Sequence, residues 1–125
     1  MGMDILSVGL GGMLGSVLRY LVSQIPVASG SFPLRTFFIN VTGSLLIGLL
    51  FALNERGGWL SENSRLFWMT GLCGGYTTFS AFSLENFQLI KAGAYGTAAF
   101  YMIASLCAGV AGVIIGIRAA ALLPR

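Results

Sequence analysis

One apolar span, at residues 66–90, is interrupted by residues that a helix tolerates poorly, and this interruption constrains the fold more than any other feature. The span is long enough to cross a bilayer as a helix, since roughly 20 apolar residues suffice. Its centre, however, reads GLCGGYTTFSAFS from Gly71 to Ser83. Paired glycines weaken a helix, and threonine hydroxyls compete for backbone hydrogen-bonding groups. The sequence therefore predicts a membrane helix that is broken near its centre, with freed backbone groups facing protein or water rather than lipid.

The composition indicates a membrane protein without catalytic machinery. Of the 125 residues, 56% are hydrophobic and 9% are charged. A soluble domain of this size could not bury so much apolar surface. The sequence has no histidine, and it shows no nucleophile–base pair or cluster of metal ligands, so no enzymatic function is expected. The net charge of +3 is too small and too scattered for a nucleic-acid-binding surface.

Four apolar segments divide the chain, with approximate bounds at 5–24, 34–53, 66–90 and 94–118. The first segment lacks a basic leader and a small-residue cleavage site, so we expect it to remain as a spanning helix. The connections are short, so the sequence predicts an all-α integral membrane protein, with one membrane domain over residues 1–125 and four transmembrane helices.

Small residues recur at helical spacing, as in Gly11 with Gly15 and in Gly112 with Gly116, which favours close helix packing. Four thin helices enclose little volume, so we expect a homodimer. Lysine and arginine are spread almost evenly over the two sides of this layout. Both a single orientation, with the N-terminus inside, and insertion in two orientations with an antiparallel dimer therefore remain open.

Polar side chains lie inside these spans, and each needs a partner or a function because hydrocarbon solvates it poorly. The set includes Thr36, Asn40, Ser44, Ser83, Glu85, Asn86, Tyr101 and Ser105, and it is accompanied by Phe79 and Phe82. Bonds to their own backbone or between helices explain any one of them. Together, beside a broken helix, they favour an ion site. Amide, hydroxyl and backbone N–H donors, with electropositive ring edges, suit a small anion that must shed water and move on.

Three stretches resemble the signatures of one family, the Fluc/CrcB fluoride channels. The first is GGMLGSVLRY at Gly11 to Tyr20, the second is FINVTGS at Phe38 to Ser44, and the third is GLCGGYTTFSAF at Gly71 to Phe82. They occur in the family's order, and the likeness covers essentially the whole chain. Two positions depart from the family's pattern, because Ala81 replaces a hydroxyl and Gly109 occupies a place often held by serine or threonine.

The resemblance implies a passive, fluoride-selective channel that exports fluoride through the inner (plasma) membrane. It implies an antiparallel, dual-topology homodimer in lipid with two pores, and no nucleic-acid partner. The implied fluoride pathway consists of Asn40, Phe79, Phe82, Ser80, Tyr101, Ser105 and Thr36. Arg19 would lie near an aqueous vestibule, and Glu85 in a polar network beside the break. A structural Na⁺ on the dimer axis would be held by the backbone carbonyls of Gly74 and Thr77 from both chains.

Two other hypotheses remain. A small proton-coupled multidrug exporter would need a carboxylate within the membrane. Glu85 is the only carboxylate well inside an apolar span, since Asp4 lies at the edge of the first. A non-transporting scaffold subunit would need no site at all. Loss of proton-coupled drug efflux in Glu85→Gln would support the exporter, whereas liposomes that release no fluoride would support the scaffold.

Overall fold

The computed structural model describes residues 1–28, 30–58 and 60–124, and all regular structure in this part of the chain is helical. The elements are α1 (Gly2–Ser23), α2 (Leu34–Glu55), α3 (Glu62–Arg65), the π-helix η1 (Leu66–Cys73), α4 (Gly74–Tyr76), α5 (Phe79–Lys91) and α6 (Tyr95–Ala120). Helices α1, α2 and α6 are long and apolar enough to cross a membrane. The predicted all-α fold with membrane-spanning helices is confirmed at this level.

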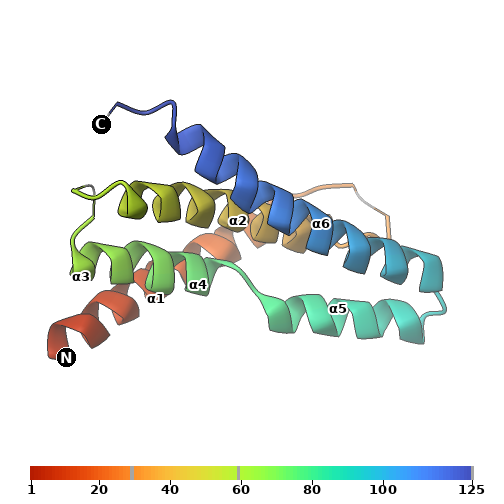
Figure 1. The fold of residues 1–125 in the computed structure, drawn as a ribbon. Coiled ribbons are helices and arrows are strands. Elements are labelled where there is room, and N and C mark those ends of the chain that lie inside the picture. Colours follow the sequence, from red (N-terminus) through yellow and green to blue (C-terminus); the bar gives the residue numbers. More distant parts are fainter. Residues whose placement is uncertain (29, 59, 125) are drawn as a thin grey trace.

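The third apolar segment consists of several helical pieces. In Figure 1, α3, η1 and α4 follow one another in line, whereas α5 is offset from that line. The backbone leaves helical geometry at Thr77 (φ −81°, ψ 156°) and at Thr78 (φ −146°, ψ 116°). The Thr78 hydroxyl then accepts a hydrogen bond from the Ala81 N–H at 3.2 Å, so Thr78 is the N-cap of α5. The chain therefore changes direction between α4 and α5.

Glycines on the helix surfaces allow close packing at two places in the fold. Helix α1 packs on η1 and α4, and a Cβ atom at Gly15 would overlap the Leu72 carbonyl oxygen. Helix α2 packs on α6, where a Cβ atom at Gly116 would overlap the Leu45 carbonyl oxygen. The backbones thus approach so closely that only glycine fits, as expected where packing rather than hydrophobic burial holds helices together.

Helices α2 and α6 run side by side in the same direction, and α5 lies beside the first part of α6 (Figure 1). Tyr101, on α6, is completely buried in a cluster with Leu89 and Ala98, against which Phe82 packs. Much of the outer surface consists of exposed apolar side chains, such as Phe100, Ile103 and Leu106 on α6. Such a surface is suited to lipid or to another protein chain.

Candidate functional site

An open groove of about 710 Å³ lies beside the non-helical residues Thr77 and Thr78. It is formed between α2, the segment from η1 to α5, and α6. Six of the residues that the resemblance assigns to the pathway or the cation line it, namely Asn40, Gly74, Thr77, Phe79, Phe82 and Ser105, and so does Ser44 of the polar set. Met69, Met102 and Leu106 supply apolar walls. No charged side chain is among the described residues that line the groove.

Asn40 holds the non-helical backbone with both ends of its amide. Its Nδ2 donates to the Thr78 carbonyl oxygen at 3.2 Å, and its Oδ1 accepts from the Thr78 N–H at 2.8 Å. In a continuous helix that N–H would donate to the carbonyl of Gly74, four residues earlier. Asn40 thus replaces the helical bond at the interruption. An amide NH₂ has two donor hydrogens, so the second hydrogen of Nδ2 can donate to an ion in the groove.

Two phenylalanine rings and a hydroxyl complete the polar and aromatic lining. The Phe79 side chain is 79% exposed, and its ring centroid lies 5.9 Å from that of Phe82. The Ser105 Oγ is buried and has no hydrogen-bond partner among the described residues. Ser80 is exposed at the start of α5 and lies 3.5 Å from the Thr78 hydroxyl, outside the groove lining. The groove therefore offers unused donors and electropositive ring edges.

The interruption also leaves backbone oxygens without donors. The Cys73 carbonyl accepts from both the N–H and the hydroxyl of Thr77, at 3.0 and 2.9 Å. The Gly75 carbonyl accepts from Arg19 Nε at 3.1 Å. Among the described residues, the Gly74 and Thr77 carbonyls accept no such bond. Unpaired carbonyls at a helix interruption are typical ligands of Na⁺, so these two oxygens fit the cation that the resemblance implies.

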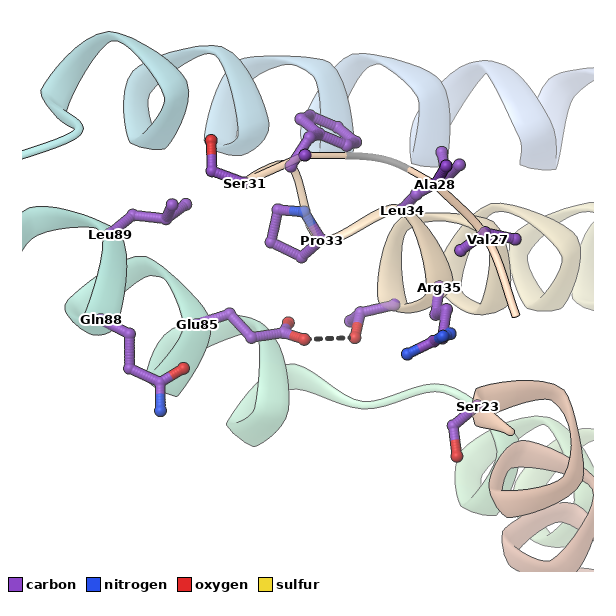
Figure 2. A pocket seen from close by; sticks show the side chains of 13 residues that line it. Ser23, Val27, Ala28, Ser31, Pro33, Leu34, Arg35, Glu85, Gln88 and Leu89 are labelled. Carbon is purple, nitrogen blue, oxygen red and sulfur yellow. Dashed lines mark hydrogen bonds between the residues drawn. The ribbon is translucent and has the colours of Figure 1, made fainter. Parts of the chain in front are cut away.

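A second polar cluster surrounds Glu85, on α5. Thr36 Oγ1 donates to Glu85 Oε2 at 2.6 Å, and the Tyr101 hydroxyl donates to Oε1 at 2.9 Å. Thr36 and Glu85 line a second pocket, of about 730 Å³, and their hydrogen bond is the dashed line in Figure 2. Tyr101 is fully buried and lines neither cavity. Its ring lies 5.0 Å from that of Phe82, between centroids, so it connects the Glu85 cluster with the groove.

The remaining contacts at the interruption hold the helices together. Arg19 is half-buried and links α1 to α4 through the Gly75 carbonyl. The hydroxyls of Thr42 and Tyr76 are hydrogen-bonded at 2.8 Å and link α2 to α4. Sequence reasoning missed the roles of Thr42, Tyr76 and Thr78. Only Thr78 carried a usable signal, because threonine is a preferred N-cap in front of a helical segment.

Curated relatives cover most of this chain. A protein of Azobacteroides pseudotrichonymphae genomovar. CFP2 is 48% identical over 111 residues, which are 87% of this chain and 89% of the relative. One of Nitrobacter winogradskyi is 49% identical over 119 residues, or 91% of this chain and 92% of the relative. One of Agrobacterium fabrum is 46% identical over 116 residues, or 91% and 93%. Each is named fluoride-specific ion channel FluC, a name that denotes a channel and not an enzyme.

The sequence model that describes "CrcB-like protein, Camphor Resistance (CrcB)" matches residues 6–117. This match begins within α1, ends near the end of α6, and includes every residue of the groove. With relatives nearly half identical along almost their whole length, it shows that the chain belongs to the CrcB-like family.

Proposed function

We propose that this chain is the subunit of a passive, fluoride-selective ion channel. The observation that carries the proposal is the uncharged groove beside Thr77 and Thr78, in a chain whose curated relatives are named for fluoride. Fluoride is small and strongly hydrated, so a pathway must replace its water with hydrogen-bond donors. A fixed positive charge in the groove would hold the ion too tightly for conduction, whereas neutral donors let it leave.

Fluoride in the groove would meet the second Nδ2 hydrogen of Asn40, the Ser105 hydroxyl and the ring edges of Phe79 and Phe82. These side chains line one cavity, and the donor atoms of Asn40 and Ser105 have capacity left. Ser80 would add a hydroxyl beside the groove. Thr36 and Tyr101 would act further along, where both donate to Glu85. Arg19 would keep the interruption in place through the Gly75 carbonyl, at the edge of an aqueous vestibule.

The pieces from α3 to α5 would together form one membrane-crossing segment, interrupted at its centre, and the chain would be a single four-helix membrane domain. Two copies would assemble antiparallel, which would give two pores and bring the two interruptions together. The Gly74 and Thr77 carbonyls of this chain, with the same two of a second copy, would hold a structural Na⁺. A bound Na⁺ would neutralise the facing carbonyl dipoles and tie the copies together.

The proposed role is fluoride export through the inner (plasma) membrane. Hydrogen fluoride crosses membranes as a neutral weak acid and dissociates in a more alkaline cytoplasm, which traps fluoride inside. A passive pore then suffices, because the membrane potential drives the anion outward. The chain needs no energy-coupling site for this role.

The test is anion release from liposomes that contain the purified protein, with fluoride and chloride compared and empty vesicles as the blank. We expect fluoride release well above the blank and little chloride release. Asn40→Ala and Phe82→Ala should each reduce fluoride release at least tenfold. The matched control is Phe87→Ala, also on α5, because the Phe87 side chain is 60% exposed and lines neither cavity.

Unchanged release in both groove variants would remove the site assignment but not the channel function. Absence of fluoride release from the unaltered protein would contradict the function itself. If the protein instead moved cationic drugs against a proton gradient, and Glu85→Gln abolished that transport, the multidrug exporter would be the better hypothesis.

A further inference from the structure

The pocket of about 730 Å³ at the start of α2 is built differently from the groove. The connection between α1 and α2 forms one side of it, and α5 forms the other with Glu85, whose side chain points toward the start of α2, and with Gln88 (Figure 2). Polar side chains such as Ser23 and Ser31 contribute to its lining, and the described residues include one basic side chain, Arg35, and one carboxylate, Glu85. Unlike the groove, this pocket therefore contains a cationic side chain that solvent can reach, together with an acidic one.

A chain of contacts connects the pocket to the groove. Glu85 lies in the pocket lining, Tyr101 donates to its carboxylate at 2.9 Å, and the Tyr101 ring packs on Phe82 at 5.0 Å between centroids. Phe82 lines the groove. Phe82, Tyr101 and Glu85 thus form a continuous series of contacts that leads from the groove to the pocket.

Arg35 is held so that its charge stays in the pocket. Its Nε donates to the Ile25 carbonyl oxygen at 2.7 Å, which fixes the guanidinium against the α1–α2 connection. The Glu85 carboxylate oxygens are occupied by Thr36 and Tyr101, and no ion pair joins Arg35 to any described residue. The terminal N–H groups of the guanidinium thus keep donor capacity for a solute.

We infer that this pocket is an anion-collecting mouth of the conduction pathway and that Arg35 raises the local concentration of small monovalent anions there. The inference rests on the proposed channel function and extends it to a residue outside the groove. Arg35 is exposed, so water competes for its donors and the ion is attracted without being trapped. Selectivity would remain with the neutral groove.

The expected effect is modest and depends on ionic strength. One unit charge about 7 Å from an ion in water changes its local concentration about threefold. Screening shortens this attraction as salt is added, since the Debye length falls from about 30 Å at 0.01 M to about 10 Å at 0.1 M. The charge of Arg35 should therefore matter at low fluoride and low salt, and it should lose its effect when either is high.

The test places opposite charges at one position. Arg35→Cys is modified with a methanethiosulfonate reagent that adds a trimethylammonium-ethyl group, or with one that adds a sulfonato-ethyl group, and fluoride release from liposomes is measured. At low fluoride and low salt, we expect the cationic adduct to release fluoride at least threefold faster than the anionic adduct. The difference should disappear in high concentrations of an impermeant salt, which a merely structural role of Arg35 would not explain.

Two controls accompany the test. The unaltered protein is treated with both reagents, because Cys107 is exposed in the single chain. Lys91→Cys carries the same adducts on an exposed residue at the end of α5, outside the pocket lining, and should show a smaller difference. Equal release by the two Arg35→Cys adducts, in a preparation whose unaltered protein conducts, would overturn the inference. If the unaltered protein does not conduct, the proposed function fails first.

Discussion

The amide of Asn40 holds Thr78, and the proposed pathway asks the same amide to serve an ion as well. It must hold the N–H and the carbonyl of Thr78, and in the proposed pathway it must also donate to fluoride. An amide can do both, because it has one acceptor and two donor hydrogens. A hydroxyl at this position could not replace all of these bonds, and a carboxylate would bring a negative charge into an anion pathway.

We predict that Asn40→Ala lowers thermal stability as well as fluoride release. The substitution leaves the N–H and carbonyl of Thr78 without partners, and an unsatisfied buried polar group costs about 1–3 kcal/mol. The melting temperature in detergent should fall by several degrees. Ser44→Ala is the control, one turn later on α2 and in the same groove, where the hydroxyl bonds to no described residue. Equal melting temperatures for Asn40→Ala and the unaltered protein would refute the holding role.

A second prediction concerns the carboxylate of Glu85. Tyr101→Phe removes the hydroxyl that donates to Glu85 at 2.9 Å but keeps the ring that packs on Phe82. The unfolding free energy should fall by about 1–3 kcal/mol, because the Glu85 oxygen loses its hydrogen-bond partner. It can be measured by thermal or denaturant unfolding in detergent. Tyr95→Phe is the control, because Tyr95 is 67% exposed and its hydroxyl has no described partner. A matching loss in both variants would show that the bond to Glu85 contributes nothing.

At the scale of helices, the two glycine faces set how closely the elements approach. Gly15→Ala and Gly116→Ala should each disrupt packing, because the added Cβ atom would overlap a backbone oxygen that cannot move away easily. We expect aggregation or a loss of unfolding free energy of about 1–3 kcal/mol or more, the usual cost of overpacking. Gly96→Ala, also within α6, meets nothing within 4 Å and should be stabilising by up to about 1 kcal/mol. Gel filtration and thermal unfolding distinguish the three variants.

The four apolar segments predicted the long helices, because the length of an apolar run and the spacing of its glycines can be recognised from neighbouring residues alone. The same reasoning predicted an interruption between Gly71 and Ser83, and helical geometry is absent at Thr77 and Thr78. It did not predict that Leu66–Cys73 is a π-helix. An apolar run is compatible both with the backbone hydrogen bonds of an α-helix, four residues apart, and with those of a π-helix, five residues apart.

The sequence also did not predict the contacts between residues that are far apart along the chain. The guanidinium of Arg56 donates to the Ala120 carbonyl and, at 2.9 Å, to the Leu123 carbonyl, and so caps the end of α6 from the end of α2. From the sequence, a basic residue after an apolar span indicates only the orientation of the chain in the membrane. The contact of Asn40 with Thr78 was missed for the same reason, because the two residues are 38 positions apart. Pairing of distant polar groups follows from tertiary packing, which spacing does not encode.

For the whole molecule, the groove beside the interruption is open along one side of a single chain, and Gly74 is exposed there. A Cβ atom at Gly74 would meet nothing within 4 Å in this chain. The exposed apolar side chains of α6 continue this surface. These features support the proposed second copy, because it would close the groove and cover the carbonyls of Gly74 and Thr77.

The last prediction therefore separates folding from assembly. Gly74→Ala should leave the single chain folded but weaken the proposed dimer, since the methyl group would stand where the proposed second copy and Na⁺ would approach. Replacing Na⁺ by a bulky organic cation should weaken the proposed dimer of the unaltered protein in the same way. Thr77→Ser should have little effect, because the proposed ligand is the backbone oxygen. Cross-linking and gel filtration in detergent, with and without Na⁺, measure all three. If Gly74→Ala dimerises normally and Na⁺ has no influence, then the unpaired carbonyls at the interruption have some other partner, and the second copy must dock elsewhere.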